Sequence, residues 1–168
     1  MKNSNRIYYL IINENLSSGL VKSQVINPIR NYKKKITLIN IGKLLSKNVC
    51  NKSIFIPFAI PYKFFLFNKL YIFIRPIALL YAIILSIIIK RNSTVISRGY
   101  FPTLVLIYLK KIKNIRIISD LRSLFIDENI KAGIIKKNSF IEKYWRNIEL
   151  EILKKSEKII AVSLGHKN

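Results

Sequence analysis

Short apolar runs alternate along this chain with longer segments whose apolar residues follow a helical period. The runs are rich in β-branched and aromatic residues and are bounded by polar residues, glycine or proline, which is typical of β-strands. The first run is continuously apolar and is typical of a central strand that is buried on both faces. We predict strands at residues 6–13, 36–42, 54–58, 94–97, 115–119 and 158–163.

The segments between these strands have the lengths that helical crossovers require. We predict helices at residues 20–35, 68–90, 103–113 and 139–156, and a short helix or loop at 43–51. Pro28 should kink or divide the first helix, because proline lacks the N–H that a helix interior needs. The alternation predicts an α/β fold, namely one Rossmann-like domain over residues 1–168. It would hold a doubly wound parallel sheet in three layers, α/β/α.

Residues 115–128 hold the polar side chains around which the chain is organised. Residues 115–119 are apolar or β-branched apart from Arg116 and Ser119, and Asp120 and Arg122 follow directly. This pattern predicts a buried strand that ends in an exposed polar corner. Parallel strands place their ligands at such carboxyl ends, in the crevice where the strand order reverses. Alternatively, Asp120 and Arg122 pair with each other, or Asp120 caps a following turn.

Other local patterns are weaker or structural. Gly19 follows the first strand after two serines, where it serves either a ligand or a simple tight turn. Ser139 and Glu142 have the spacing of a helix-capping box. In the helix that follows, Trp145 is expected to be a core anchor, and Glu151 and Lys155 are expected to pair one turn apart. We expect the single cysteine, Cys50, to be a packing residue.

The charge balance is strongly positive, with 30 Lys and Arg against 8 Asp and Glu and a formal net charge of +22. AT-rich codons offer an explanation without selection, since the chain has 34 Ile and 22 Lys but only 8 Arg. Whatever its origin, such a surface is drawn to anionic lipid headgroups and phosphates. A nucleic-acid partner is not predicted, because charge alone supports it and no recognition motif is present.

Residues 68–90 form the most hydrophobic segment and raise the question of membrane contact. The uncharged run 76–89 has 14 residues, whereas a spanning helix needs about 20. We therefore expect a core helix. The alternative is a helix that lies on the bilayer surface. It is supported by the aromatic residues Tyr71, Phe73 and Tyr81 and by the flanking cations Lys69, Lys90 and Arg91. Since the N-terminus lacks the pattern of a signal peptide, we expect a cytoplasmic protein, with peripheral contact at the inner face of the cell membrane as an alternative.

Four stretches together carry a resemblance to a known family. They are the S-S-G loop after the first strand, V-I-S-R-G-Y-F-P, I-I-S-D-L-R-S, and E-L-E-I-L-K-K-S-E-K-I-I-A-V-S near the end. This order resembles the N-terminal domain of GT-B glycosyltransferases, in particular the family 4-like group. Glu149, Glu157 and residues 159–163 match the family's helix and last strand. The residue that is often a histidine in the family is here Arg122, and the only histidine, His166, lies near the end.

The resemblance implies the acceptor-binding half of a glycosyltransferase. Such an enzyme transfers a sugar from a nucleotide-sugar to a cell-surface polysaccharide or a lipid-linked glycan. The implied acceptor-binding residues are Ser18 with its neighbour Ser17, Gly19, Arg98, Gly99, Asp120, Arg122 and Glu128. Asp120 would hydrogen-bond a sugar hydroxyl or orient Arg122, whose planar fork suits a phosphate or carboxylate. No metal site and no catalytic residue is assigned.

In that family a second, C-terminal domain binds the nucleotide-sugar, and the present chain reaches only the end of the first domain. We therefore expect no cofactor in these residues, with the nucleotide-sugar held by a donor-binding domain or a separate chain, and we expect a truncated or split enzyme that is inactive alone. The competing interpretations are a non-catalytic binding module and a membrane-surface protein that use the same sheet.

Overall fold

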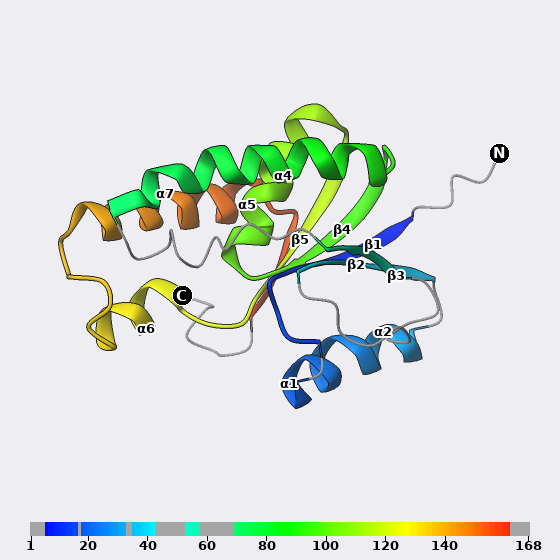
Figure 1. The fold of residues 1–168 in the computed structure, drawn as a ribbon, viewed down its shortest axis with the longest axis horizontal. Coiled ribbons are helices and arrows are strands. Elements are labelled where there is room, and N and C mark those ends of the chain that lie inside the picture. The colour runs from blue at the N-terminus through cyan, green and yellow to red at the C-terminus, as the bar shows by residue number, and fades with distance from the viewer. Residues whose placement is uncertain (1–5, 17, 33–34, 43–52, 58–68, 162–168) are drawn as a thin grey trace.

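The structure, a computed structural model, describes residues 6–16, 18–32, 35–42, 53–57 and 69–161. Its centre is a six-stranded sheet in the order β3-β2-β1-β4-β5-β6, with every neighbouring pair parallel (Figure 1). The strands are β1 (Ile7–Ile12), β2 (Ile36–Ile41), β3 (Ser53–Ile56), β4 (Ser93–Arg98), β5 (Ile115–Leu121) and β6 (Lys158–Ala161). The order runs outward from β1 in both directions, so it reverses between β1 and β4. The predicted doubly wound parallel sheet is confirmed.

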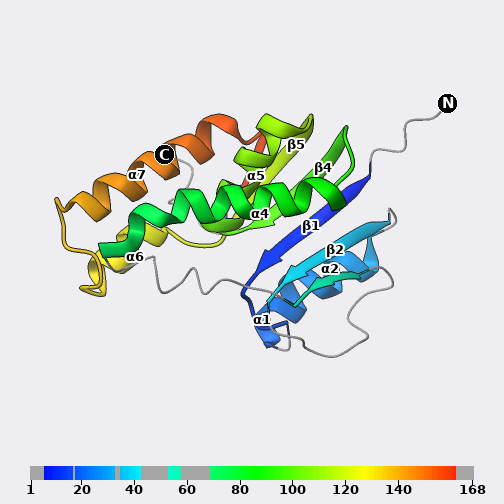
Figure 2. The same cartoon turned by 45° about the horizontal axis from the view of Figure 1, so that its top comes forward.

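Helices cover both faces of this sheet (Figures 1 and 2). One face carries α1 (Gly19–Val21), the π-helical turn η1 (Lys22–Ile26) and α2 (Asn27–Asn31). The other carries η2, a 3₁₀ turn (Lys69–Phe73), α4 (Ile74–Ile88), α5 (Tyr100–Ile112) and α7 (Phe140–Lys155), and the short helix α6 (Phe125–Lys131) follows β5. These elements form the three predicted layers.

The alternation of side chains along β1 explains why both faces need a cover. Tyr8, Leu10 and Ile12 belong to the large core under α4, α5 and α7. Tyr9 and Ile11 point the other way, into a smaller core under α1 and α2. Because each face buries apolar side chains, the strand reads as one continuous apolar run in the sequence.

Pro28 divides the first predicted helix, as expected. An α-helix would bring its ring against the carbonyl group of Gln24 and would lack one hydrogen bond. The chain avoids this with the π-helical turn, in which the Asn27 N–H donates to the Lys22 carbonyl group five residues earlier. The helical path therefore continues into α2 and ends at Asn31.

Three elements differ from the predicted ones. Helix α5 begins at Tyr100 rather than 103, because Pro102 lies in its first turn, where its missing N–H needs no partner. The predicted loop after β5 contains α6, whose first turn carries Asp127 and Glu128, both favourable near a helix N-terminus. Strand β5 continues through Asp120 to Leu121. Ser17, Cys50, His166 and residues 43–51 lie outside the described residues.

The local predictions on α7 are confirmed, with one change. The Ser139 hydroxyl accepts from the Glu142 N–H at 3.2 Å, but the Glu142 carboxylate accepts from the Asn138 N–H instead of the expected Ser139 N–H. Trp145 is fully buried. Glu151 and Lys155 form the expected ion pair, 2.7 Å apart.

Candidate functional site

Charged side chains meet where β1 and β4 end, at the point where the strand order reverses. Arg98 closes β4, and its Nε donates to the carboxylate of Glu14, just beyond β1, at 2.8 Å. Its Nη2 donates to the Gln24 side-chain oxygen at 3.1 Å. Arg98 is only 5% exposed. The ion pair therefore bridges the two halves of the sheet at the switch point.

Asp120 lies at the end of β5, and it is buried rather than part of an exposed polar corner. Only 1% of its surface is exposed. Its Oδ2 accepts from the hydroxyl of Tyr9 at 2.5 Å and from Arg122 Nη2 at 2.8 Å, and Arg122 Nε lies 2.6 Å from Oδ1. These two partners replace the water that the carboxylate gives up on burial, as a buried charge requires. The prediction of an exposed polar corner is thus wrong for Asp120. The alternative that we considered, a pairing of Asp120 with Arg122, is confirmed.

The electrostatic environment of this cluster follows from burial and from the Asp120 charge. Burial, followed by the adjacent Asp120 carboxylate, raises the pKa of Tyr9 well above its usual value. Burial alone would lower the pKa of Arg122, but its bonds to Asp120 outweigh this and raise the pKa. Tyr9 is therefore a neutral donor and Arg122 a permanent cation.

Gly99 makes the turn from β4 into α5. Its φ of 86° and ψ of 177° lie in a region of backbone conformation that residues other than glycine rarely adopt. In this conformation its N–H donates to the Asp120 carbonyl group at 2.9 Å. Its own carbonyl group accepts from the Thr103 hydroxyl at 2.7 Å. The first turn of α5 is thereby held at the carboxyl rim of the sheet, with the positive end of its dipole toward the rim.

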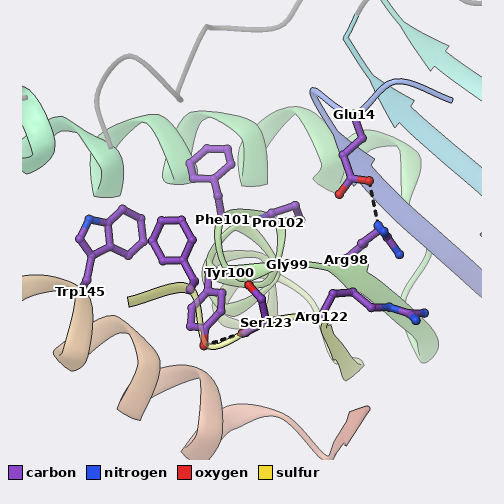
Figure 3. A pocket seen from close by; sticks show the side chains of 10 residues that line it. Glu14, Arg98, Gly99, Tyr100, Phe101, Pro102, Arg122, Ser123 and Trp145 are labelled. Atoms are coloured by element: carbon purple, nitrogen blue, oxygen red, sulfur yellow. Dashed lines mark hydrogen bonds and ion pairs between the residues drawn. The ribbon is translucent and has the colours of Figure 1, made fainter. Parts of the chain in front are cut away.

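A cavity of about 240 Å³ lies beside this turn (Figure 3). Its polar side holds the charged residues of the rim, and its other side is aromatic. The rings of Tyr100 and Phe125 pack at a tilt of 36°, with their centroids 5.3 Å apart. The ring of Phe125 meets Trp145 edge-on, with the centroids 5.2 Å apart. The lining residues are Glu14, Arg98, Gly99, Tyr100, Phe101, Pro102, Arg122, Ser123, Phe125 and Trp145.

The Tyr100 hydroxyl fixes one wall of the cavity. It donates to Glu149 of α7 at 2.7 Å, and burial together with this bond raises the pKa of Tyr100 above its usual value. Glu149 also accepts from Arg146, which pairs with Asp127 of α6 as well. The other glutamate of the family resemblance, Glu157, is exposed at the start of β6.

Three of the predicted acceptor-binding residues, Arg98, Gly99 and Arg122, line the cavity. Asp120 lies behind Arg122 and holds it in place. The other three lie apart from the described lining. The Ser18 hydroxyl caps α1 by accepting from the Val21 N–H, and Gly19 starts α1. Glu128 is exposed on α6.

Sequence reasoning missed Glu14 and the aromatic wall. Glu14 could have been found, because it follows β1 as Asp120 follows the apolar part of β5. The aromatic wall could not have been found in this way. Its residues Tyr100, Phe125 and Trp145 belong to three separate helices, and each lies in a sequence pattern that is typical of an ordinary core residue.

Two buried donors in this site make no hydrogen bond to a described residue, and one of them, Arg122 Nε, is compensated by its ion pair with Asp120. Arg98 Nη1 is buried and makes no hydrogen bond to any described residue. A buried donor without a partner costs about 1–3 kcal/mol. Within the described ranges, no group of three or more His, Cys, Asp or Glu side chains could hold a metal ion.

Comparison with models of known protein families and with curated protein sequences finds no match for this chain.

Proposed function

We propose that this domain binds a small acceptor with an anionic or hydroxyl-rich group in the cavity beside Gly99, as the acceptor-binding half of a glycosyltransferase. The acceptor class is a cell-surface polysaccharide end or a lipid-linked glycan. The observation that carries this proposal is Arg98, a buried cation at the switch point whose Nη1 has no described partner.

Arg98 supports an oxygen-rich ligand for a chemical reason. Glu14 and Gln24 occupy two of its nitrogen atoms and hold the guanidinium group in one orientation. A planar guanidinium group held in this way recognises phosphate, carboxylate or paired hydroxyl oxygens with little further loss of side-chain freedom. A ligand oxygen at Nη1 would remove the cost of the unpartnered donor.

The size and lining of the cavity support a single ring or a small charged group. About 240 Å³ is below the range of about 300–1,000 Å³ that is usual for pockets that enclose drug-sized ligands. Charged groups on one side and the rings of Tyr100 and Phe125 on the other match a sugar ring, which has both polar edges and apolar faces. Arg122 adds a second cation, held by Asp120.

Binding of simple probes tests this proposal. Glucose 1-phosphate, glucose and inorganic phosphate are titrated into the wild-type chain by NMR or calorimetry. Arg98→Lys keeps the charge but loses the planar fork, so we expect glucose 1-phosphate binding to weaken about tenfold or more. Arg116→Lys is the matched control, since Arg116 is exposed at the other end of the β4–β5 pair.

Thermal unfolding of both variants checks whether each of them still folds. If Arg98→Lys and wild type bind all three probes equally, or if none of the probes shifts any resonance of the cavity residues, the proposed acceptor site is wrong.

A further inference from the structure

The outer face of α4 is apolar, and no described residue covers it. Ile72, Phe73, Leu79, Leu80, Ile83 and Ile87 lie along one stripe of η2 and α4, and all six are exposed. The opposite stripe packs into the core through Ile74, Ala78, Tyr81, Ala82 and Leu85. A helix that is apolar all round is normally covered on every side. This face is therefore a candidate docking surface.

The prediction of a core helix is thus confirmed for the inner stripe of α4, whose side chains are buried, but not for its outer stripe, whose side chains are exposed. The helical stretch Leu70–Ile88 has 19 residues and a mean hydropathy of 2.2, so its length and composition would allow it to cross a membrane, and 28% of it is buried. Its contacts with α5 and its place in the core that also includes side chains of the sheet make it part of the domain, on the same side as α5 and α7 (Figure 2). Contact with a surface, rather than insertion across one, fits a helix that keeps its inner stripe in a protein core.

The charges around this face indicate which kind of partner would bind it. No acidic residue lies between Glu14 and Asp120, so α4, α5 and their connections carry cations alone. Lys90 and Arg91 are exposed just beyond α4, and Lys110 and Lys111 are exposed at the end of the neighbouring α5. A second copy of the chain would bring another formal charge of +22 against the first, which opposes self-association.

We infer that the outer face of α4 docks on an anionic lipid bilayer, with its apolar side chains at the level of the acyl boundary and the flanking Lys and Arg at the headgroups. This inference is independent of the proposed acceptor site. It identifies a lipid surface as the partner by two features together, an apolar stripe that no described residue covers and exposed cations at the ends of α4 and α5, two helices that carry no carboxylate of their own.

Sedimentation with lipid vesicles tests the inference on the full chain. Wild type is mixed with vesicles of phosphatidylcholine alone or with added phosphatidylglycerol. We expect binding to the anionic vesicles that weakens with salt, and much weaker binding to the neutral ones. The variant Ile83→Glu/Ile87→Glu should bind the anionic vesicles at least about tenfold more weakly than wild type, because its two new carboxylates cannot replace the apolar contacts of the isoleucine side chains with the bilayer. They are 50% and 85% exposed, so the fold does not depend on them.

Two variants serve as controls. Leu20→Glu adds a similar carboxylate to α1, which lies on the opposite face of the sheet (Figure 1). Because this side chain is 60% exposed, the variant should fold and bind vesicles almost as wild type does. Arg98→Lys should also bind normally, which separates this face from the acceptor site. Equal vesicle binding by wild type and the α4 double variant would overturn the inference. So would a wild-type dimer in light scattering that the double variant abolishes without any effect of vesicles.

Discussion

Tyr9 links strands that are not neighbours. Its hydroxyl leaves β1, passes β4 and donates to Asp120 on β5. The carboxylate would otherwise lie buried against Arg122 alone. A hydrogen bond to a charged group contributes about 1.5–3 kcal/mol, so this single hydroxyl contributes substantially to the rim of the sheet.

Tyr9→Phe should therefore lower the free energy of unfolding by about 1–3 kcal/mol at neutral pH, as measured by urea denaturation. Tyr32→Phe, at an exposed position, is the control and should change it little.

The raised pKa of Tyr9 predicts the direction in which stability changes with pH. The pKa of Tyr9 is raised above its ordinary value of 10.0, so the protonated phenol stabilises the folded state fully below pH 10. Above pH 10 the unfolded phenol ionises first, and this contribution declines as the pH rises. Wild type should thus lose stability above pH 10 more steeply than Tyr9→Phe. Parallel decline of the two proteins, followed by circular dichroism, would show that the Tyr9 hydroxyl is not responsible.

At the scale of the element, the β4–α5 turn depends on the backbone of Gly99. Gly99→Ala should destabilise the protein by about 1–3 kcal/mol, because φ is 86° and ψ is 177°, although an added Cβ would meet no atom within 4 Å. Gly19→Ala is the matched control, since a Cβ there also meets nothing and the residue starts a helix. We expect that variant to be neutral or slightly more stable. Urea unfolding measures both, and equal losses would contradict the conformational explanation.

The sequence predicts elements well where one pattern decides them. The predicted strands 6–13 and 94–97 agree with β1 and β4 to about a residue, because continuous runs of apolar and β-branched residues leave few alternatives. Pro28 correctly predicted an interruption of the regular α-helix, here a π-helical turn, because the effect of proline on the helix is local. The end of β5 was missed, since the burial of Asp120 depends on Tyr9, which lies 111 residues earlier in the chain. The cavity was anticipated only at its charged side, because the aromatic wall assembles from distant elements.

At the scale of the whole molecule, the proposed function assigns the described structure to one side of a reaction cleft. Glycosyl transfer needs the donor diphosphate and the acceptor hydroxyl held in line by groups from both sides. We therefore expect residues 1–168 to show no turnover or hydrolysis of nucleotide-sugars, measured by release of the nucleotide. A mixture without protein gives the background rate. Activity above this background that Arg98→Lys reduces would refute the expectation.

The strand order has a consequence for synthesis of the chain. Strand β1 leaves the ribosome first, but its neighbour β4 begins only at Ser93, with β2 and β3 between them in the sequence. Until then, one edge of a fully apolar strand stays open, and open edges invite pairing between nascent chains. Apart from Glu14, every charged residue made during this interval is a cation. Mutual repulsion of the emerging chains therefore opposes pairing at this edge until β4 is made.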